Sequence, residues 1–130
     1  MELSLVFADS EVASVESEAN AVFIRLSAAH VLRQPLSGEG KAGEGFARGV
    51  VLLLKGASLN GAESHFAGSI ALGRLKIGGV WSSTLALPSS TPSDVSLELT
   101  FANQSLLVLA ASGIEGRFEG EPNFAESLFC

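Results

Sequence analysis

The chain lacks most of the residue types from which metal, redox and nucleic-acid sites are built. Its 130 residues include one cysteine, Cys130, and no tyrosine. One thiol cannot close a disulfide within the chain, and it excludes a zinc site made from several cysteines. Trp81 is the one tryptophan, so a platform that stacks the bases of single-stranded nucleic acid would have few members besides phenylalanine.

Basic residues are also scarce. The sequence has 8 lysines and arginines against 14 aspartates and glutamates, which gives a net charge of -6 at pH 7. A negative protein repels the phosphate backbone and anionic membrane surfaces. We therefore expect neither nucleic acid nor a membrane to be a partner.

Long apolar runs are absent, although the composition is 47% hydrophobic and 17% charged. The runs Val50–Leu54 and Leu106–Ala111 are far shorter than the roughly 20 residues of a membrane-spanning helix. Residues 1–9 lack the basic and apolar regions of a secretory signal. We expect one folded domain over residues 1–130 and a cytoplasmic location.

Period-two alternation is clearest over residues 94–101, where Val95, Leu97, Leu99 and Phe101 share one face. This pattern predicts a half-buried strand. Residues 102–105, Ala-Asn-Gln-Ser, predict a turn, and the apolar run from Leu106 predicts the second strand of a hairpin. Residues 112–113 then permit a reversal into a further strand over 114–118.

Further strands are predicted on either side of compact turns. Two glycine-containing pairs, Asn60-Gly61 and Gly78-Gly79, suit two-residue hairpin turns. Gly68 and Gly73 lie within a predicted strand, where glycine marks a bulge or bend. The remaining predicted strands cover residues 3–7, 20–32, 46–55, 65–77 and 80–87.

Three segments are expected to be something other than strands. Residues 10–18 are ambiguous between a loop, a helical turn and an irregular strand, and we favour a loop. Residues 88–93, with two prolines, are expected to connect strands. Residues 123–126, Asn-Phe-Ala-Glu, match a helix-capping pattern, which predicts a short C-terminal helical turn with a strand as the alternative.

About eight short strands with frequent turn signals and no long helical pattern predict an all-β fold. Tight turns between consecutive strands make it a mainly antiparallel meander. The glycine-marked bends favour a barrel-like or strongly curved sandwich.

Residues 38–45, GEGKAGEG, contain the glycine spacing of a dinucleotide-binding loop. That loop requires a helix among its glycines, whose N-terminus receives the phosphates. The β-prone run from Phe46 offers no helix, and Glu39 and Glu44 place negative charge where a phosphate would lie. We interpret the segment as a mobile connection between strands and expect no cofactor.

Four residues are candidates for a pocket or an interface: Arg25, His30, His65 and Trp81. Arg25 interrupts an apolar run, so it lies either on an exposed strand face or paired with a carboxylate at a pocket mouth. A metal site would need His30, His65 and a carboxylate to meet across strands, and a lone histidine is more often a structural hydrogen-bonding residue. Trp81 is expected to fill the core or plug the end of a barrel.

No set of catalytic residues can be named, because neither a G-x-S-x-G elbow nor a calcium loop is present. We therefore expect a non-enzymatic module that binds a protein partner or associates with itself through exposed strand edges or apolar patches, such as the run 50–54. The alternative is a carrier of a small apolar ligand inside a β-barrel.

Overall fold

We analysed a computed structural model that describes residues 2–34, 43–59, 65–120 and 125–126. Within these ranges the chain forms twelve strands, and every strand pair is antiparallel. The predicted all-β fold is confirmed. The described residues include no helix that is long and apolar enough to cross a membrane.

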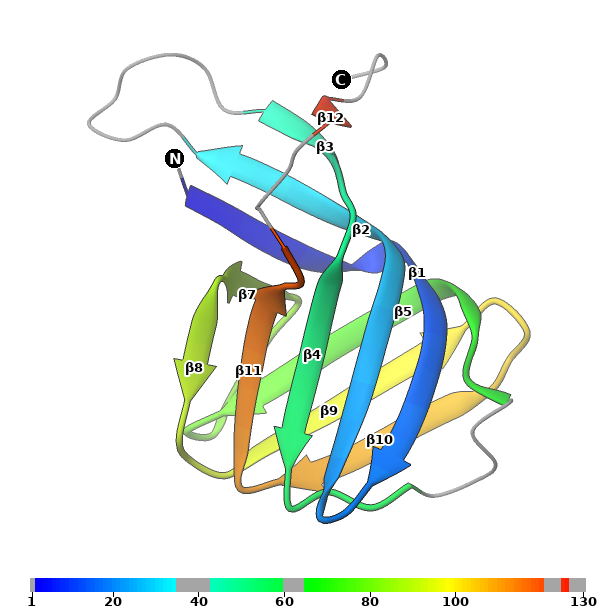
Figure 1. Cartoon of the computed structure of the whole chain (residues 1–130), viewed down its shortest axis with the longest axis vertical. Coiled ribbons are helices and arrows are strands. Elements are labelled where there is room, and N and C mark those ends of the chain that lie inside the picture. The colour runs from blue at the N-terminus through cyan, green and yellow to red at the C-terminus, as the bar shows by residue number, and fades with distance from the viewer. Residues whose placement is uncertain (1, 35–42, 60–64, 121–124, 127–130) are drawn as a thin grey trace.

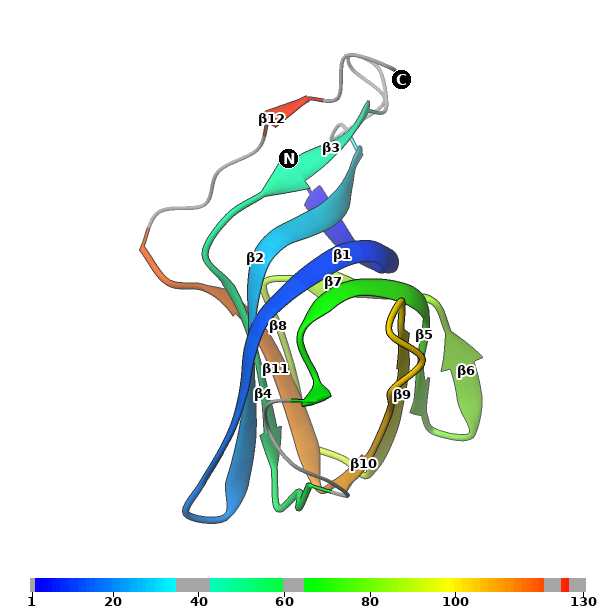
Figure 2. The ribbon, with the colours of Figure 1, turned by 90° about the vertical axis from the view of Figure 1, so that its right-hand side faces the viewer.

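The strands form two layers that face each other (Figures 1 and 2). The front layer contains β1 (Glu2–Glu18), β2 (Ala21–Gln34), β4 (Val50–Lys55), β11 (Gly113–Phe118) and β8 (Ser89–Thr91). The back layer contains β5 (Gly68–Ile77), β6 (Val80–Ser82), β9 (Val95–Phe101) and β10 (Leu106–Ala111).

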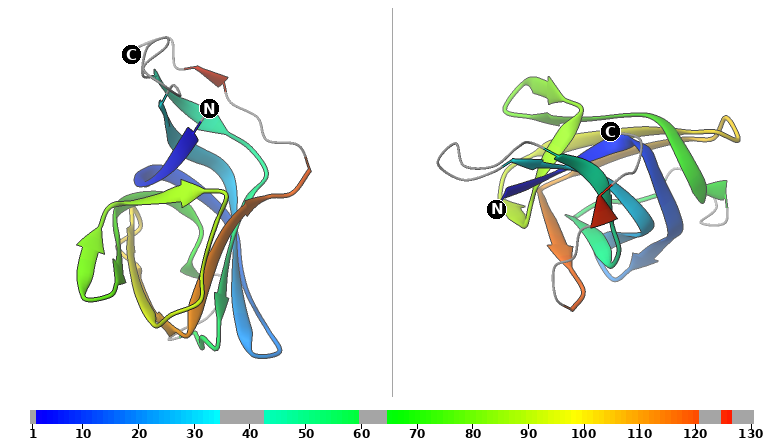
Figure 3. Two further views of the ribbon diagram at one scale, coloured as in Figure 1. Left: turned by 90° about the vertical axis from the view of Figure 1, so that its left-hand side faces the viewer. Right: turned by 90° about the horizontal axis from the view of Figure 1, so that it is seen from above.

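The hairpin of β1 and β2 is long and bent, and its open end extends beyond the two layers (Figure 3). Three short strands pair with this extension: β3 (Gly43–Ala47) with β2, β12 (Ala125–Glu126) with β3, and β7 (Thr84–Leu87) with β1. The first strand and the last described strand therefore belong to the same part of the fold, because β3 connects β12 to the pairing of β1 with β2.

The core lies between the layers. Val22 and Ile24 of β2 and Leu97 and Leu99 of β9 are 0% exposed. The alternation predicted for residues 95–101 is confirmed, since Val95, Leu97, Leu99 and Phe101 are buried and the intervening residues are half-buried. Removing this apolar surface from water contributes roughly 1.5–3 kcal/mol for each large side chain, which is the main term that holds the two layers together.

The layers meet at one edge but do not close into a barrel. β1 joins β5 through two residue pairs, Glu11 with Ser69 and Val12 with Gly68, and the strand order ends at β10 on one side and β8 on the other. The barrel form of our expectation is therefore wrong, and the curved sandwich describes the fold.

Two predicted turns are confirmed. Ile77 pairs with Val80 across Gly78 and Gly79, whose φ angles are 58° and 80°, as a two-residue turn between twisted strands requires. The hairpin of β9 and β10 turns over residues 102–105. After β10 the chain leaves its layer, because β11 pairs with β4 and β8.

Several predicted boundaries are wrong. Residues 10–18 are part of β1 instead of a loop, because the bent hairpin pairs them with β2. The run 46–55 is two strands separated by a bend, and 80–87 is likewise two strands. Within 88–93, residues 89–91 form β8. A hairpin across Asn60-Gly61 does not form, since β4 pairs with β2 and β11 instead of β5; the dipeptide itself lies outside the described residues.

The glycine segment and the C-terminal segment also differ from expectation. Residues 43–45 belong to β3 and pair with β2, so the connection ends at Gly43 and no helix starts there. Residues 38–42 lie outside the described residues. Ala125 and Glu126 form β12, the alternative to the expected helical turn; residues 123 and 124 lie outside the described ranges.

Candidate functional site

A bulge in β1 lies within a polar cluster that joins β1, β2 and β3. The pairing of β1 with β2 breaks between Val6 and Glu11, and Asp9 within this stretch has a φ angle of 68°. A bulge leaves backbone groups without ladder partners and bends the strand. The bulge therefore bends the long hairpin and requires other groups to satisfy the backbone.

Ser10 satisfies two of these backbone groups. Its side chain is 0% exposed. The hydroxyl donates a hydrogen bond to the carbonyl of Val6 over 2.7 Å and accepts one from the backbone N–H of His30 over 2.8 Å. Ser10 is thus a polar bridge that replaces the missing rungs between β1 and β2.

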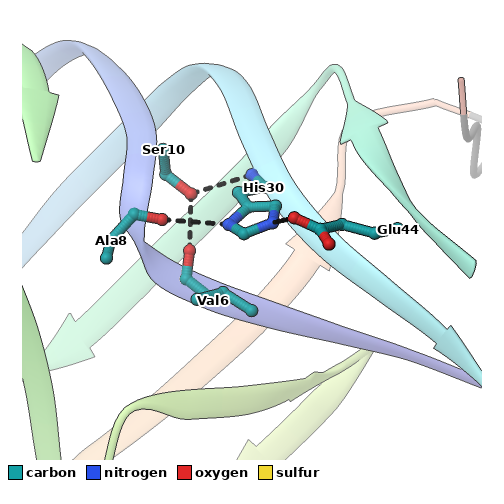
Figure 4. Close-up of polar contacts among 5 residues, drawn as sticks. All are labelled: Val6, Ala8, Ser10, His30 and Glu44. Atoms are coloured by element: carbon teal, nitrogen blue, oxygen red, sulfur yellow. Dashed lines mark hydrogen bonds and ion pairs between the residues drawn. The ribbon is translucent and has the colours of Figure 1, made fainter. Parts of the chain in front are cut away.

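The imidazole of His30 connects the bulge to β3 (Figure 4). Its Nδ1 lies 3.1 Å from the carbonyl oxygen of Ala8, and its Nε2 lies 2.5 Å from Oε1 of Glu44. The side chain of His30 is 12% exposed and that of Glu44 is 44% exposed. A carbonyl and a carboxylate are both acceptors, so each ring nitrogen of His30 faces an oxygen that can accept a hydrogen bond.

The serine, histidine and glutamate do not form a nucleophile and base in this arrangement. The Ser10 hydroxyl contacts the backbone of His30 instead of its ring, whereas an activated serine requires a hydrogen bond from its hydroxyl to an imidazole nitrogen. Both ring nitrogens face other oxygens. The cluster is built to tie three strands together.

The structure separates the four residues predicted to line a pocket or an interface. Arg25 lies on the outside of the front layer and pairs with Glu119 and, over 3.8 Å, with Glu16. His65 lies before β5, stacks edge-on against Phe66 and accepts a hydrogen bond at its carbonyl from Asn103. No group of three or more His, Cys, Asp or Glu side chains is arranged for a metal ion in the described ranges.

Trp81 is not a core residue, so that expectation is wrong. It is 37% exposed and lies beside Lys76 on the outside of the back layer. The Arg74 guanidinium carbon lies 3.9 Å from the centre of its ring, and Arg74 also bonds to Oε1 of Glu98 through Nε and an Nη over 2.9 Å each. The indole thus packs against a cation that a carboxylate holds in place.

Trp81 belongs to a larger surface that we call the exposed back face. Its side chains lie in three rows across the back layer, which follow from the strand register: Leu106, Thr100 and Leu72; Val108, Glu98 and Arg74; and Ala110, Ser96, Lys76 and Trp81. A hollow of about 410 Å³ lies among Leu72, Arg74, Glu98 and Thr100.

Large apolar side chains are exposed on this face. The exposed fraction is 69% for Leu72, 50% for Leu106 and 41% for Val108. The predicted apolar patch at 50–54 is wrong, because β4 lies inside the front layer between β2 and β11, and Val50, Leu52 and Leu54 are at most 1% exposed.

Sequence reasoning missed Ser10 and Glu44 as partners of His30. It also missed Leu72, Leu106 and Val108 as exposed residues. A serine within residues 1–18 and a glutamate in a glycine-rich segment carry no local sign that a bulge brings them together. In β10 every residue is apolar, so no alternation marks the outward side chains.

Comparisons of the chain with protein-family models, with curated proteins and with solved structures find no match.

Proposed function

We propose that this protein is a non-enzymatic interaction module that binds a protein partner through the exposed back face. The observation that carries the proposal is the exposure of Leu72, Trp81, Leu106 and Val108 on one side of one sheet. Scattered apolar residues are common on protein surfaces, whereas a contiguous apolar patch marks an interaction site.

The physical basis is the apolar surface that a partner would cover. Covering such surface contributes about 25 cal/mol for each Å² removed from water. Trp81 adds a large side chain, and tryptophan and arginine are enriched among the residues that dominate binding energy. Arg74 is already bonded to Glu98, so a partner could cover the centre of the face without leaving that cation unpaired.

The outside of the front layer has a different character. Ion pairs join Arg25 to Glu16 and Glu119 and Lys55 to Glu115. Side chains of this kind remain solvated, because desolvating a charge is costly. The contrast between the two outer surfaces supports the exposed back face as the contact surface.

Carrying a small apolar ligand has no comparable support. Such a carrier needs a hollow between the layers, whereas the hollow of about 410 Å³ lies on the exposed back face. A second hollow, of about 640 Å³, lies at one end of the sandwich and is lined by Gly56 after β4 and by Gly78, Gly79 and Asp94 at the ends of back-layer strands. Between the layers, buried apolar side chains of both form one core cluster.

We also propose a cytoplasmic location. The support is the single cysteine, because proteins of oxidising compartments often rely on disulfides.

The interaction is testable by photo-crosslinking in cells that make the protein. Benzoylphenylalanine would replace Leu72 on the exposed back face or Val80, which is 68% exposed and precedes Trp81 on β6. Adjacent residues of a strand point to opposite faces, so Val80 is a control of matched exposure. We expect adducts from position 72 and few from position 80. Equal adducts from both positions, or none from either, would contradict the proposal.

A further inference from the structure

We infer that the partner of the exposed back face is the same face of a second copy of this chain, in a two-fold symmetric dimer. The inference rests on the proposed function, because it names the occupant of the surface proposed there. Two properties of the face carry it, its charge and the pairing of its ions, and the size of the face sets the expected affinity.

The charge of the chain is distributed unevenly. Between His65 and Ile114, the segment that builds the back layer, the charged residues are Arg74, Lys76, Asp94 and Glu98. Two are basic and two are acidic, so the segment has no net charge. The rest of the chain therefore carries the whole net charge of -6.

This distribution decides how two copies can approach. Surfaces of like charge repel, and the repulsion disfavours any contact made through the acidic parts of both molecules. The exposed back face is where two copies can meet without that repulsion. The face itself carries Arg74, Lys76 and Glu98, which sum to +1, and Asp94 lines the hollow at its end together with Lys76. With Asp94 included the net charge is zero, so this surface favours neither an acidic nor a basic partner. A neutral apolar surface fits another neutral apolar surface, and a second copy supplies one.

The ion pair between Arg74 and Glu98 can be buried against the same pair on a second copy of the chain. Arg74 bonds to Glu98 across the two neighbouring strands and also covers the ring of Trp81. Breaking a buried ion pair is costly, whereas an intact pair can be covered with its partner present. Each copy thus brings a pair that is already complete.

The size of the face predicts a dimer that dissociates readily. Four strands about 4.8 Å apart and about six residues of about 3.3 Å each cover a plane on the order of 400 Å². A standard interface buries about 800 Å² from each partner. The expected dimer is therefore weak, and its population depends on protein concentration.

The test is sedimentation equilibrium of the purified full chain from micromolar to millimolar concentration. We expect a monomer–dimer equilibrium for the wild type. Leu72→Glu and Leu72→Lys each place a charge on both faces of the dimer, so we expect each to raise the dissociation constant at least tenfold. Val80→Glu makes the same change at an equally exposed position on the other side of the sheet, and we expect the wild-type constant. Circular dichroism checks that each variant is folded.

A wild type that stays monomeric at millimolar concentration would overturn the inference. So would a Val80→Glu effect equal to that of Leu72→Glu.

The two proposals fail separately. If position 72 forms adducts with a different protein and the purified chain is monomeric, the proposed function holds and the second copy is wrong. If position 72 gives no specific adduct and the chain is monomeric, both are wrong. Adducts with the mass of two copies, together with a dimer sensitive to Leu72→Glu, support both.

Discussion

Gly73 of β5 lies directly against Phe7 of β1: a Cβ atom built on Gly73 would stand 2.4 Å from the Cβ of Phe7. Phe7 is 1% exposed and lies near the edge where β1 joins β5 and connects the layers. Glycine permits this close approach because it has no side chain. Gly73 therefore marks a close approach between the layers, whereas the irregularity of β5 lies between Ile70 and Leu72.

The first prediction concerns this contact. We expect Gly73→Ala to lower the free energy of unfolding by about 1–3 kcal/mol, the range for overpacking a core. The Cβ of Phe7 is fixed to its backbone and cannot rotate away, and Leu99 is also only 2.9 Å from the new atom. Urea denaturation measures the change. Ala71→Ser, at an exposed position on the same strand, should stay within about 0.5 kcal/mol of wild type, and an equal loss there would contradict the explanation.

The second prediction concerns the bulge. Ser10→Ala removes the hydroxyl that bridges the Val6 carbonyl and the His30 N–H. Leaving buried polar groups unsatisfied costs about 1–3 kcal/mol, and we expect that loss in denaturant unfolding. The control is Ser14→Ala on the same strand, where the side chain is exposed and contacts Glu16 over 3.3 Å. If both alanine variants are as stable as wild type, the bridge does not support the bulge.

The third prediction separates the two contacts of the His30 ring. Glu44→Gln removes a half-exposed charge, so we expect it to lower stability by about 1 kcal/mol or less, as for other exposed ion pairs. His30→Leu leaves the Ala8 carbonyl without its ring partner and should cost about 1–3 kcal/mol. Thermal unfolding of both variants at equal salt gives the comparison. A larger loss of stability for Glu44→Gln than for His30→Leu would contradict this expectation. It would show that the contact with Glu44 stabilises the fold more than the contact of the His30 ring with the Ala8 carbonyl.

The fourth prediction uses Trp81, the one tryptophan of the chain, as a fluorescent reporter of the exposed back face. Arg74 covers one face of its ring at 3.9 Å, whereas the Lys76 amine lies 5.8 Å from the ring centre. We expect Arg74→Ala to increase acrylamide quenching of the fluorescence more than Lys76→Ala does. Quenching that is equal in the two variants would mean that Arg74 does not shield the ring in solution.

Much of the local structure could be predicted from the residues alone. The alternation of residues 95–101 and the glycine pair at 78–79 predicted a strand and a turn that the structure confirms. These features are local. Alternation identifies a strand where one face is apolar and the other is polar, and a tight turn depends on the backbone freedom of two residues. The same local reasoning failed for residues 10–18, where pairing with β2 holds a polar segment in a strand.

The candidate sites depended on contacts that are distant in sequence. His30 could be judged a structural hydrogen-bonding residue, but its partners Ala8 and Glu44 are 22 and 14 residues away. Trp81 was expected inside because tryptophan is large and apolar, yet Arg74 shields it on the outside of the sheet.

The sequence by itself determined that this protein is an all-β chain with a sparse, acidic charge, because composition and period-two alternation are properties of the residues. Only the tertiary structure decided which strands are neighbours and which apolar residues face water. In β10 six apolar residues follow one another, and three of them are exposed. Their pattern is uniform, so it is the pairing with β9 that assigns each side chain to the core or to the exposed back face.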